Sequence, residues 1–262
     1  MVTEVARLDV SLRRRSLLVS TAAMAAFVIA VVALYPVFMR HRSLVGLFHR
    51  GAGPAAVFGV SGTLTSPSGW LNAYVYSSVF PLVTLLLTIG YGAWAVAGQE
   101  NDGSLGMLST LPVHRSTIAV QKVAVMLALS LVVAVVVTGC ALLGQLFDVK
   151  TSVSAVVTTS AAVALVGFDF GLISMAIGTL TAKRGLAIAI TALVAAVSYG
   201  VGAVAQVVDV MRPGRYASVF FWSVQNGQIS HGVTPVDFAV LGAVAVVLLA
   251  ITLPAFQRLD LH

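Results

Sequence analysis

Six long apolar runs constrain the fold of this sequence more than any other feature. The hydrocarbon core of a bilayer is about 30 Å thick, so a transmembrane helix needs about 20 apolar residues. The runs of that length are residues 17–39, 71–97, 123–147, 153–180, 186–208 and 238–256. A transmembrane barrel is disfavoured, because segments of about ten residues with alternating polarity do not recur. The sequence therefore predicts an all-α integral membrane protein with six transmembrane helices in a single domain over residues 1–262.

The composition excludes a soluble globular protein. Hydrophobic residues make up 59% of the chain and charged residues 9%, whereas charged residues make up about 25% of soluble domains. The first run is also unlike a cleavable signal peptide, whose apolar region has about 7 to 15 residues and ends in small residues. Tyr35, Pro36 and Phe38 stand at that end of the run. We therefore expect the first run to be a retained span.

Basic residues predict the orientation of the chain. An even number of spans places both termini on one side of the membrane. That side holds nine basic residues, which are Arg7, Arg13, Arg14, Arg15, Arg115, Lys122, Lys183, Arg184 and Arg258. The opposite side holds six, which are Arg40, Arg42, Arg50, Lys150, Arg212 and Arg215. Because Lys and Arg are enriched in cytoplasmic loops, the counts predict cytoplasmic termini.

The net charge of +6 indicates attraction to anionic membrane lipids. The basic residues are scattered over short loops and form no stripe interleaved with aromatics, so no nucleic-acid partner is predicted. At the amino terminus, Val5, Leu8 and Leu12 share one helical face beside several arginines. This pattern predicts an amino-terminal interfacial helix before the first span. The alternative is a frayed basic tail that only sets topology.

The polar stretch 99–122 between the second and third runs has a helix pattern of its own. Asp102 or Ser104 can cap a helix start, and Leu105, Leu108 and Leu111 recur at three-residue spacing. A helix of about two turns is unstable alone in water. We therefore expect a short cytoplasmic coupling helix here, which docks on a soluble partner.

The same stretch carries a family pattern. Its members are Glu100, Gly103, Ser104, Leu105, Leu108, Pro112 and Arg115, followed by Lys122. This pattern resembles the cytoplasmic loop of type 2 ABC-exporter permeases, with Ser104 in place of a threonine and Asn101 in place of a common acidic residue. Thr65, Pro67 and Gly69 at the entry to the second run are similar to the same family. Asn226 and Gly227 before the last run are similar too, although Val219 replaces the family's proline.

The resemblance implies a permease subunit of the bacterial cytoplasmic membrane, multi-pass and with cytoplasmic termini. It would form half of a pathway that exports a hydrophobic or amphipathic compound. Its partners would be two ATP-binding cassette subunits and a second permease, identical or homologous. ATP and magnesium would bind those subunits, and no cofactor, metal or catalytic residue is expected here. The nearest lysine context, GTLTAKRG at 178–185, lacks the spacing of a phosphate-binding loop.

The resemblance assigns coupling to Glu100, Asp102, Gly103, Ser104, Leu105, Leu108, Leu111, Pro112 and Arg115. The leucines would anchor the helix in a groove of the ATPase, and the two acidic residues would favour its positive end. Arg115 would contact an acidic site on the ATPase. The alternative is an ordinary capped loop with solvated charges.

Inside the membrane, Asp169 is the one ionisable residue near the middle of a run. A charge there costs about 2.5 to 3.5 kcal/mol, so it should face the bundle interior or a wet cavity. It stands between Gly167 and Gly171, whose spacing would let another helix approach closely. Asp169 is either a substrate or proton contact, or a protonated side chain bonded to a neighbouring helix. In the second case Asn should replace it better than Leu.

Four further positions are singled out. Pro81 frees a carbonyl in the second run, so it either bends the helix to shape the pathway or is a passive kink. Gly200 and Gly202 are possible contacts of a permease dimer, as the family suggests. The single cysteine, Cys140, has no disulfide partner in the chain and is expected to pack.

Two other classes fit parts of the sequence. An intramembrane serine protease would use Ser61 between Val60 and Gly62, but no histidine lies in an apolar run, so the serine has no evident base. An ion-coupled secondary transporter is the stronger alternative. Such proteins usually show repeated halves and more intramembrane ionisable groups.

Overall fold

The structure is a computed structural model that describes residues 4–40, 66–98, 115–147 and 149–257. All regular elements in these ranges are helical. The α-helices are α1 (Glu4–Arg40), α4 (Pro67–Leu71), α5 (Phe80–Ala93), α8 (Arg115–Leu143), α9 (Val153–Thr181), α10 (Arg184–Val207), α11 (Gln228–His231) and α12 (Pro235–Gln257). The π-helical segments are η1 (Asn72–Val79), η2 (Trp94–Gly98) and η5 (Phe221–Gln225), and the 3₁₀ segments are η3 (Gly144–Phe147) and η4 (Asp209–Ala217).

Six helical stretches are long and apolar enough to cross a membrane. They are Arg15–Arg40, Pro67–Gly98, Ser116–Phe147, Val153–Thr181, Arg184–Gln206 and Pro235–Phe256. Each coincides with one of the predicted runs, so the predicted all-α fold with six membrane-spanning helices is confirmed. Residues 4–14, where an interfacial helix is predicted, are helical and form the first turns of α1.

Among the spans that begin earlier than their apolar runs, the second and the sixth do so for local reasons. The second begins at Pro67 because the Ser66 hydroxyl accepts a hydrogen bond from the Gly69 N–H at 3.1 Å. The sixth begins at Pro235 because Thr234 and Asp237 form a reciprocal cap. The Thr234 N–H donates to Asp237 Oδ2 at 2.9 Å, and the Asp237 N–H donates to Thr234 Oγ1 at 3.3 Å. Such caps satisfy backbone donors that a helix start leaves open.

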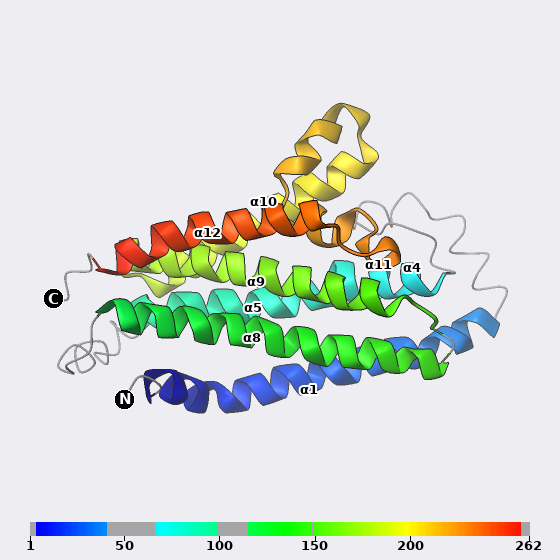
Figure 1. Cartoon of the computed structure of the whole chain (residues 1–262), viewed down its shortest axis with the longest axis horizontal. Coiled ribbons are helices and arrows are strands. Elements are labelled where there is room, and N and C mark those ends of the chain that lie inside the picture. The colour runs from blue at the N-terminus through cyan, green and yellow to red at the C-terminus, as the bar shows by residue number, and fades with distance from the viewer. Residues whose placement is uncertain (1–3, 41–65, 99–114, 148, 258–262) are drawn as a thin grey trace.

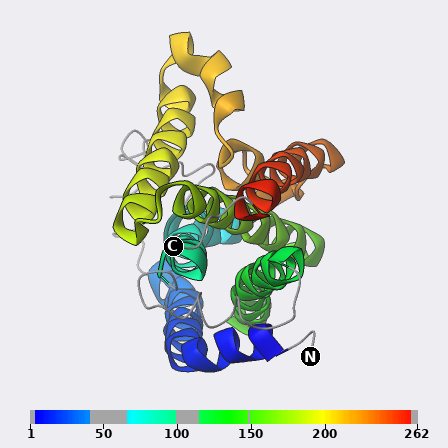
Figure 2. The same cartoon turned by 90° about the vertical axis from the view of Figure 1, so that its left-hand side faces the viewer.

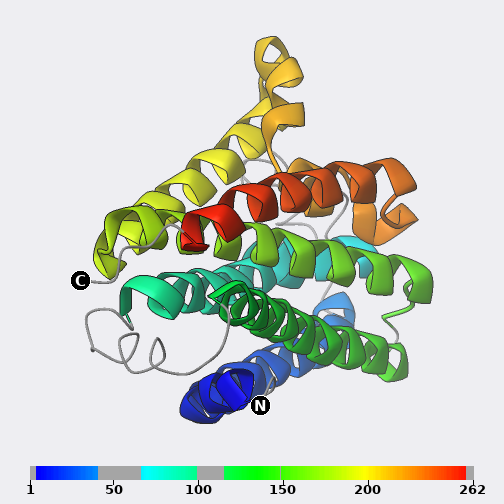
Figure 3. The ribbon, with the colours of Figure 1, turned by 60° about the vertical axis from the view of Figure 1, so that its left-hand side comes forward.

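Helix α9 is the centre of the bundle (Figure 1) and packs against α5, α8, α10 and α12. Helix α1 packs along α8 at the far side of the bundle, as Figure 3 shows. Helix α10 leans away from the other helices, with η4 folded back along its end (Figure 2). Four helix ends lie together at one end of the bundle (Figure 1). They are the start of α1, the end of α12, the end of η2 and the start of α8.

Small residues bring α9 and α5 into close contact. A Cβ added at Gly167 would collide with Thr84, and a Cβ added at Gly92 would collide with the Gly171 carbonyl oxygen. The Ser174 hydroxyl also donates to the Ile89 carbonyl across the same contact, at 2.9 Å. The close helix approach predicted for Gly167 and Gly171 is therefore present, and α5 is the helix that approaches.

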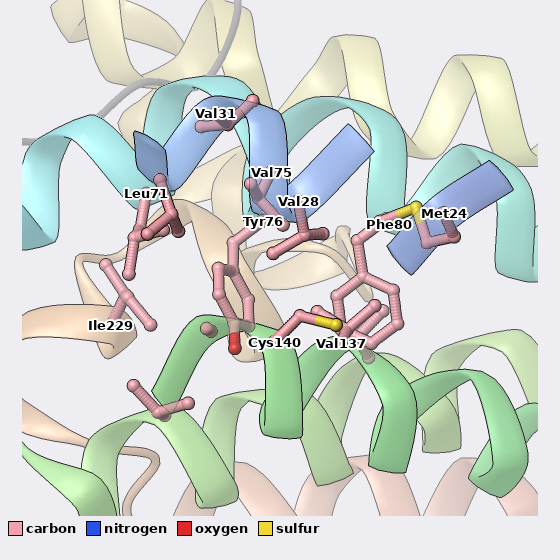
Figure 4. Close-up of a cluster of buried hydrophobic side chains, with 14 of the residues drawn as sticks. Met24, Val28, Val31, Leu71, Val75, Tyr76, Phe80, Val137, Cys140 and Ile229 are labelled. Carbon is pink, nitrogen blue, oxygen red and sulfur yellow. The ribbon is translucent and has the colours of Figure 1, made fainter. Parts of the chain in front are cut away.

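A second core region joins α1, the start of the second span and α8 (Figure 4). Its buried side chains include Met24, Val28, Tyr76, Phe80 and Val137. Cys140 is buried in the same cluster. Its surroundings are apolar, as expected for a packing role.

Candidate functional site

The predicted coupling stretch lies mostly outside the described residues. This applies to Glu100, Asp102, Gly103, Ser104, Leu105, Leu108, Leu111 and Pro112. Arg115 opens α8, and its side chain also lies outside the described part. The structure does describe the two helix ends that the stretch connects, which are η2 and the first turns of α8.

These two helix ends are held together by Lys122. Its side chain is fully buried, and its Nζ lies 5.7 Å from the centroid of the Trp94 ring in η2. The Trp94 ring also covers Gly98, where an added Cβ would lie 2.6 Å from the indole Cδ1. A cation over an aromatic face is attractive, and more so when it is removed from water. The end of the second span and the start of the third are thus in direct contact through these residues.

Sequence reasoning counted Lys122 as a charge that sets orientation and as the last residue of the family pattern. The structure instead buries it in the contact between two spans. The available signal was the placement of Trp94 and Lys122 on opposite flanks of one loop, since such a pair can meet when the loop closes.

Asp169 lies within α9 with 1% of its surface exposed. Neither of its carboxylate oxygens has a hydrogen-bond partner among the described residues. Successive residues of an α-helix are turned by about 100°, so Asp169 lies roughly opposite Gly167 and Gly171 and away from α5. It lies instead on the side of Leu172, whose carbonyl accepts a hydrogen bond from Thr252 of α12 at 3.5 Å.

This placement bears on the two hypotheses for Asp169. An interhelical hydrogen bond requires a partner, and the described part of the chain supplies none to its oxygens. A buried polar group without a partner is costly, and such groups are commonest where function requires them.

Pro81 lies in the first turn of α5, directly after the π-helical segment η1. The carbonyl that a regular α-helix would pair with the N–H of residue 81 belongs to Ser77, four residues earlier. The Tyr199 hydroxyl of α10 donates a hydrogen bond to this carbonyl at 2.6 Å. The Ser77 carbonyl, four residues before Pro81, is therefore bonded to another span. Sequence reasoning missed Tyr199, because nothing near it in the chain indicates its partner.

The two glycines proposed for a dimer contact have different surroundings. Gly202 is buried, and an added Cβ would collide with the Gln225 side chain and lie 2.7 Å from Ser218 Oγ. Its missing side chain thus serves a contact inside the subunit. Gly200 has no atom within 4 Å of an added Cβ. Only Gly200 therefore stands beside open space.

The aromatic residues in and just after η4 also differ in their surroundings. Tyr216 is exposed, whereas Phe220 and Phe221 are buried. Phe220 lies between Phe170 of α9, with ring centroids 5.6 Å apart, and Tyr199 of α10, at 5.3 Å. Phe220 and Phe221 thus belong to the core of the chain.

Comparison with models of known protein families and with curated proteins finds no match for this chain. Within the described ranges, no three His, Cys, Asp or Glu side chains are grouped so that they could hold a metal ion. The chain is a multi-span helical membrane protein.

Proposed function

We propose that this chain is the permease subunit of an ABC transporter. It would form half of a translocation pathway and be powered by two separate ATP-binding subunits. The observation that carries the proposal is the loop pattern of residues 100–115 together with its location. The loop joins two spans at the end of the bundle where both described chain ends also lie (Figure 1).

The contacts at that end suggest how a docked loop would move the spans. Lys122 and Trp94 join the helix ends that flank the loop, so a displacement of the loop would move both ends together. Helix α5 is locked to α9 by the glycine contacts described above. Packed helices move as rigid bodies rather than deform continuously. Closure of the ATPase subunits would therefore tilt several spans as one unit and change access to the pathway.

A second permease would pair with this one, and α10 offers a surface that fits this role. Exposed apolar residues follow one another along α10 at alternating spacings of four and three, with Gly200 continuing the series. They are Leu186, Ile190, Leu193, Val197, Gly200 and Val204. This spacing is that of a helix seam that packs against another helix.

The exported compound would be hydrophobic or amphipathic, since apolar side chains dominate the spans. An ion-coupled secondary transporter is the second candidate function. The observation in its favour is Asp169, a buried acid whose oxygens have no described partner. A transporter driven by an ion gradient would use such a group to bind the ion.

Purification of the tagged chain from its native membrane in mild detergent tests the proposal. We expect ATP-binding subunits to copurify in a ratio of about one to one, and the complex to hydrolyse ATP. A chain that purifies without an ATPase, and transports its substrate in vesicles on an ion gradient alone, would instead support the second candidate.

A further inference from the structure

We propose that η4 forms a phospholipid site at the outer boundary of the membrane, where its apolar face lies among lipid chains and the Arg215 guanidinium binds a lipid phosphate. The fifth candidate span ends at Gln206, and η4 begins at Asp209. This end of α10 is remote from the loop at 100–115 and is the outer end in the predicted orientation. A segment that follows a span so closely meets the headgroup region of the bilayer.

The winding of η4 sorts its side chains into three faces, because positions three apart in a 3₁₀ helix lie one above the other. The faces are Asp209, Arg212 and Arg215; Val210, Pro213 and Tyr216; and Met211, Gly214 and Ala217. On the first face, Arg212 Nη2 lies 3.0 Å from Asp209 Oδ1, as this stacking requires. The second face is exposed, with Val210 at 89%. A charged face beside an apolar face is typical of helices that lie in the membrane interface.

The two exposed faces of η4 are left uncovered by the chain. No residue of η4 is buried, and its main contacts are with α10 and η5. The third face is the one turned toward α10, since a Cβ added at Gly214 would lie 3.8 Å from Val201 Cγ1. Figure 2 shows η4 at the end of α10, away from the rest of the bundle. Its apolar face is therefore open to lipid.

Arg215 carries the charge that a lipid phosphate would meet. Its Cζ lies 4.8 Å from the centroid of the Tyr216 ring and 5.1 Å from that of Phe221. Its Nη2 donates a hydrogen bond to the Tyr216 hydroxyl at 2.7 Å. Among the described residues Arg215 has no acidic partner, and its buried Nε has no hydrogen-bond partner. Aromatic faces attract a cation but do not neutralise it, so the planar guanidinium remains available for a phosphate.

The rings around Arg215 hold the guanidinium in place. Trp222 Nε1 donates a hydrogen bond to the Tyr216 carbonyl at 3.0 Å. The ring centroids of Tyr216 and Phe221 and of Phe221 and Trp222 are both 5.4 Å apart. Phe221 is buried, whereas Tyr216 is exposed. Tyr and Trp are enriched at the headgroup level, and the phosphate of every phospholipid lies at that level. Lipid is therefore the anion source that fits this site.

Nitroxide labels measure the depth of η4 in phosphatidylglycerol nanodiscs, in a Cys140→Ala background. The label on Val210→Cys should be relaxed mainly by lipid-soluble oxygen. The label on Asp209→Cys, one face away, should be relaxed mainly by a water-soluble nickel chelate. Relaxation of both labels by the chelate would show that η4 stands in water and would overturn the inference. Protection of both labels from both reagents would show that protein covers η4, such as a second copy of the chain, and would also overturn it.

Binding of phosphatidylglycerol to the purified chain, followed by native mass spectrometry, tests the phosphate contact. Arg215→Gln should weaken binding about fivefold, the effect of one basic residue near an anionic surface. Lys150→Gln is the matched control, because it removes another exposed cation on the predicted outer side, and it should change binding little. Equal weakening by both variants, or by neither, would overturn the inference.

Inorganic phosphate distinguishes a lipid site from a site for a free anion. Because the apolar face would hold the lipid chains, an equal concentration of inorganic phosphate should not displace phosphatidylglycerol. Displacement would overturn the assignment to lipid. Val210→Ser changes only an exposed side chain, so it remains informative if Arg215→Gln does not fold. It should weaken lipid binding, and unchanged binding would contradict the role of the apolar face.

These measurements use the purified chain, so their results do not depend on the proposed function. Loss of the lipid site would leave the pairing with ATP-binding subunits untouched. Absence of any ATPase partner would refute the proposed function and leave the lipid site in place.

Discussion

At the scale of single residues, Asp169 and Lys122 show how differently two buried charged side chains can be placed. Lys122 lies against an aromatic ring at the end of a span, where a long side chain can be partly stabilised. Asp169 is enclosed within a span and has no described partner for either oxygen. The sequence predicted that Asp169 is buried, because a lone acid in an apolar run must avoid lipid. Its missing partner depends on the packing of distant helices and could not be predicted.

The surroundings of Asp169 lead to a prediction for stability. A buried group without a partner costs about 1 to 3 kcal/mol. We therefore expect the free energy of unfolding of Asp169→Leu to be at least as high as that of the wild type and of Asp169→Asn. Ser174→Ala on the same helix is the control. It removes the hydrogen bond to the Ile89 carbonyl and should lower the free energy of unfolding by about 1 kcal/mol.

Transport by the same variants separates the roles of Asp169. Loss of transport in both Asp169→Asn and Asp169→Leu, with stability retained, identifies a proton or substrate contact. Unfolding of Asp169→Leu alone would instead show that an interhelical hydrogen bond exists and would contradict the placement described above.

At the scale of helices, sequence patterns predicted where the spans lie but not how they are wound. Each apolar run became a span because hydropathy reflects the bilayer thickness. The π-helical segment η1 carries no such signal in hydropathy, since hydropathy does not distinguish one helical winding from another. The start of α8 was also missed, because its first turns contain polar residues, of which Gln121 and Lys122 are buried.

The contact between α5 and α9 gives a matched pair of glycines for a test. Gly92→Ala would place a methyl group against the Gly171 carbonyl oxygen, whereas Gly90→Ala meets no atom within 4 Å. Overpacking typically costs about 1 to 3 kcal/mol, while Ala in place of Gly in an open helix position adds about 0.5 to 1 kcal/mol of stability.

Denaturant unfolding of the two alanine variants in detergent measures the difference. We expect Gly92→Ala to be less stable and Gly90→Ala slightly more stable than the wild type. Equal stability of the two variants would show that α5 and α9 are not in close backbone contact.

At the scale of the whole molecule, the bundle leaves α10 and α12 largely uncovered while α9 is enclosed. Sequence predicted the number of spans, but the central place of α9 follows from glycine contacts that only the assembled helices show. Family resemblance placed the dimer contact at Gly200 and Gly202. The structure assigns Gly202 to packing inside the subunit and leaves Gly200 on the open side.

The open side of α10 predicts a pattern of crosslinks between permeases. Single cysteines along α10, in a Cys140→Ala background, should crosslink best at Leu193, Val197 and Gly200. Ala195, which is 6% exposed on the opposite face, should crosslink poorly. A flat profile, or a maximum at Ala195, would rule out this face as the dimer contact.

The central claim is that a partner ATPase drives this chain through the loop at 100–115. Its most direct test is capture of ATP-binding subunits from the native membrane by the tagged chain carrying Leu108→Asp or Thr110→Asp. Both changes add one charge, but on the predicted helix Leu108 would lie on the apolar stripe and Thr110 roughly opposite it. We predict that Leu108→Asp loses the ATPase and ATP-driven transport although it remains in the membrane, and that Thr110→Asp keeps both. Wild-type capture and transport by a well-expressed Leu108→Asp variant would contradict the claim.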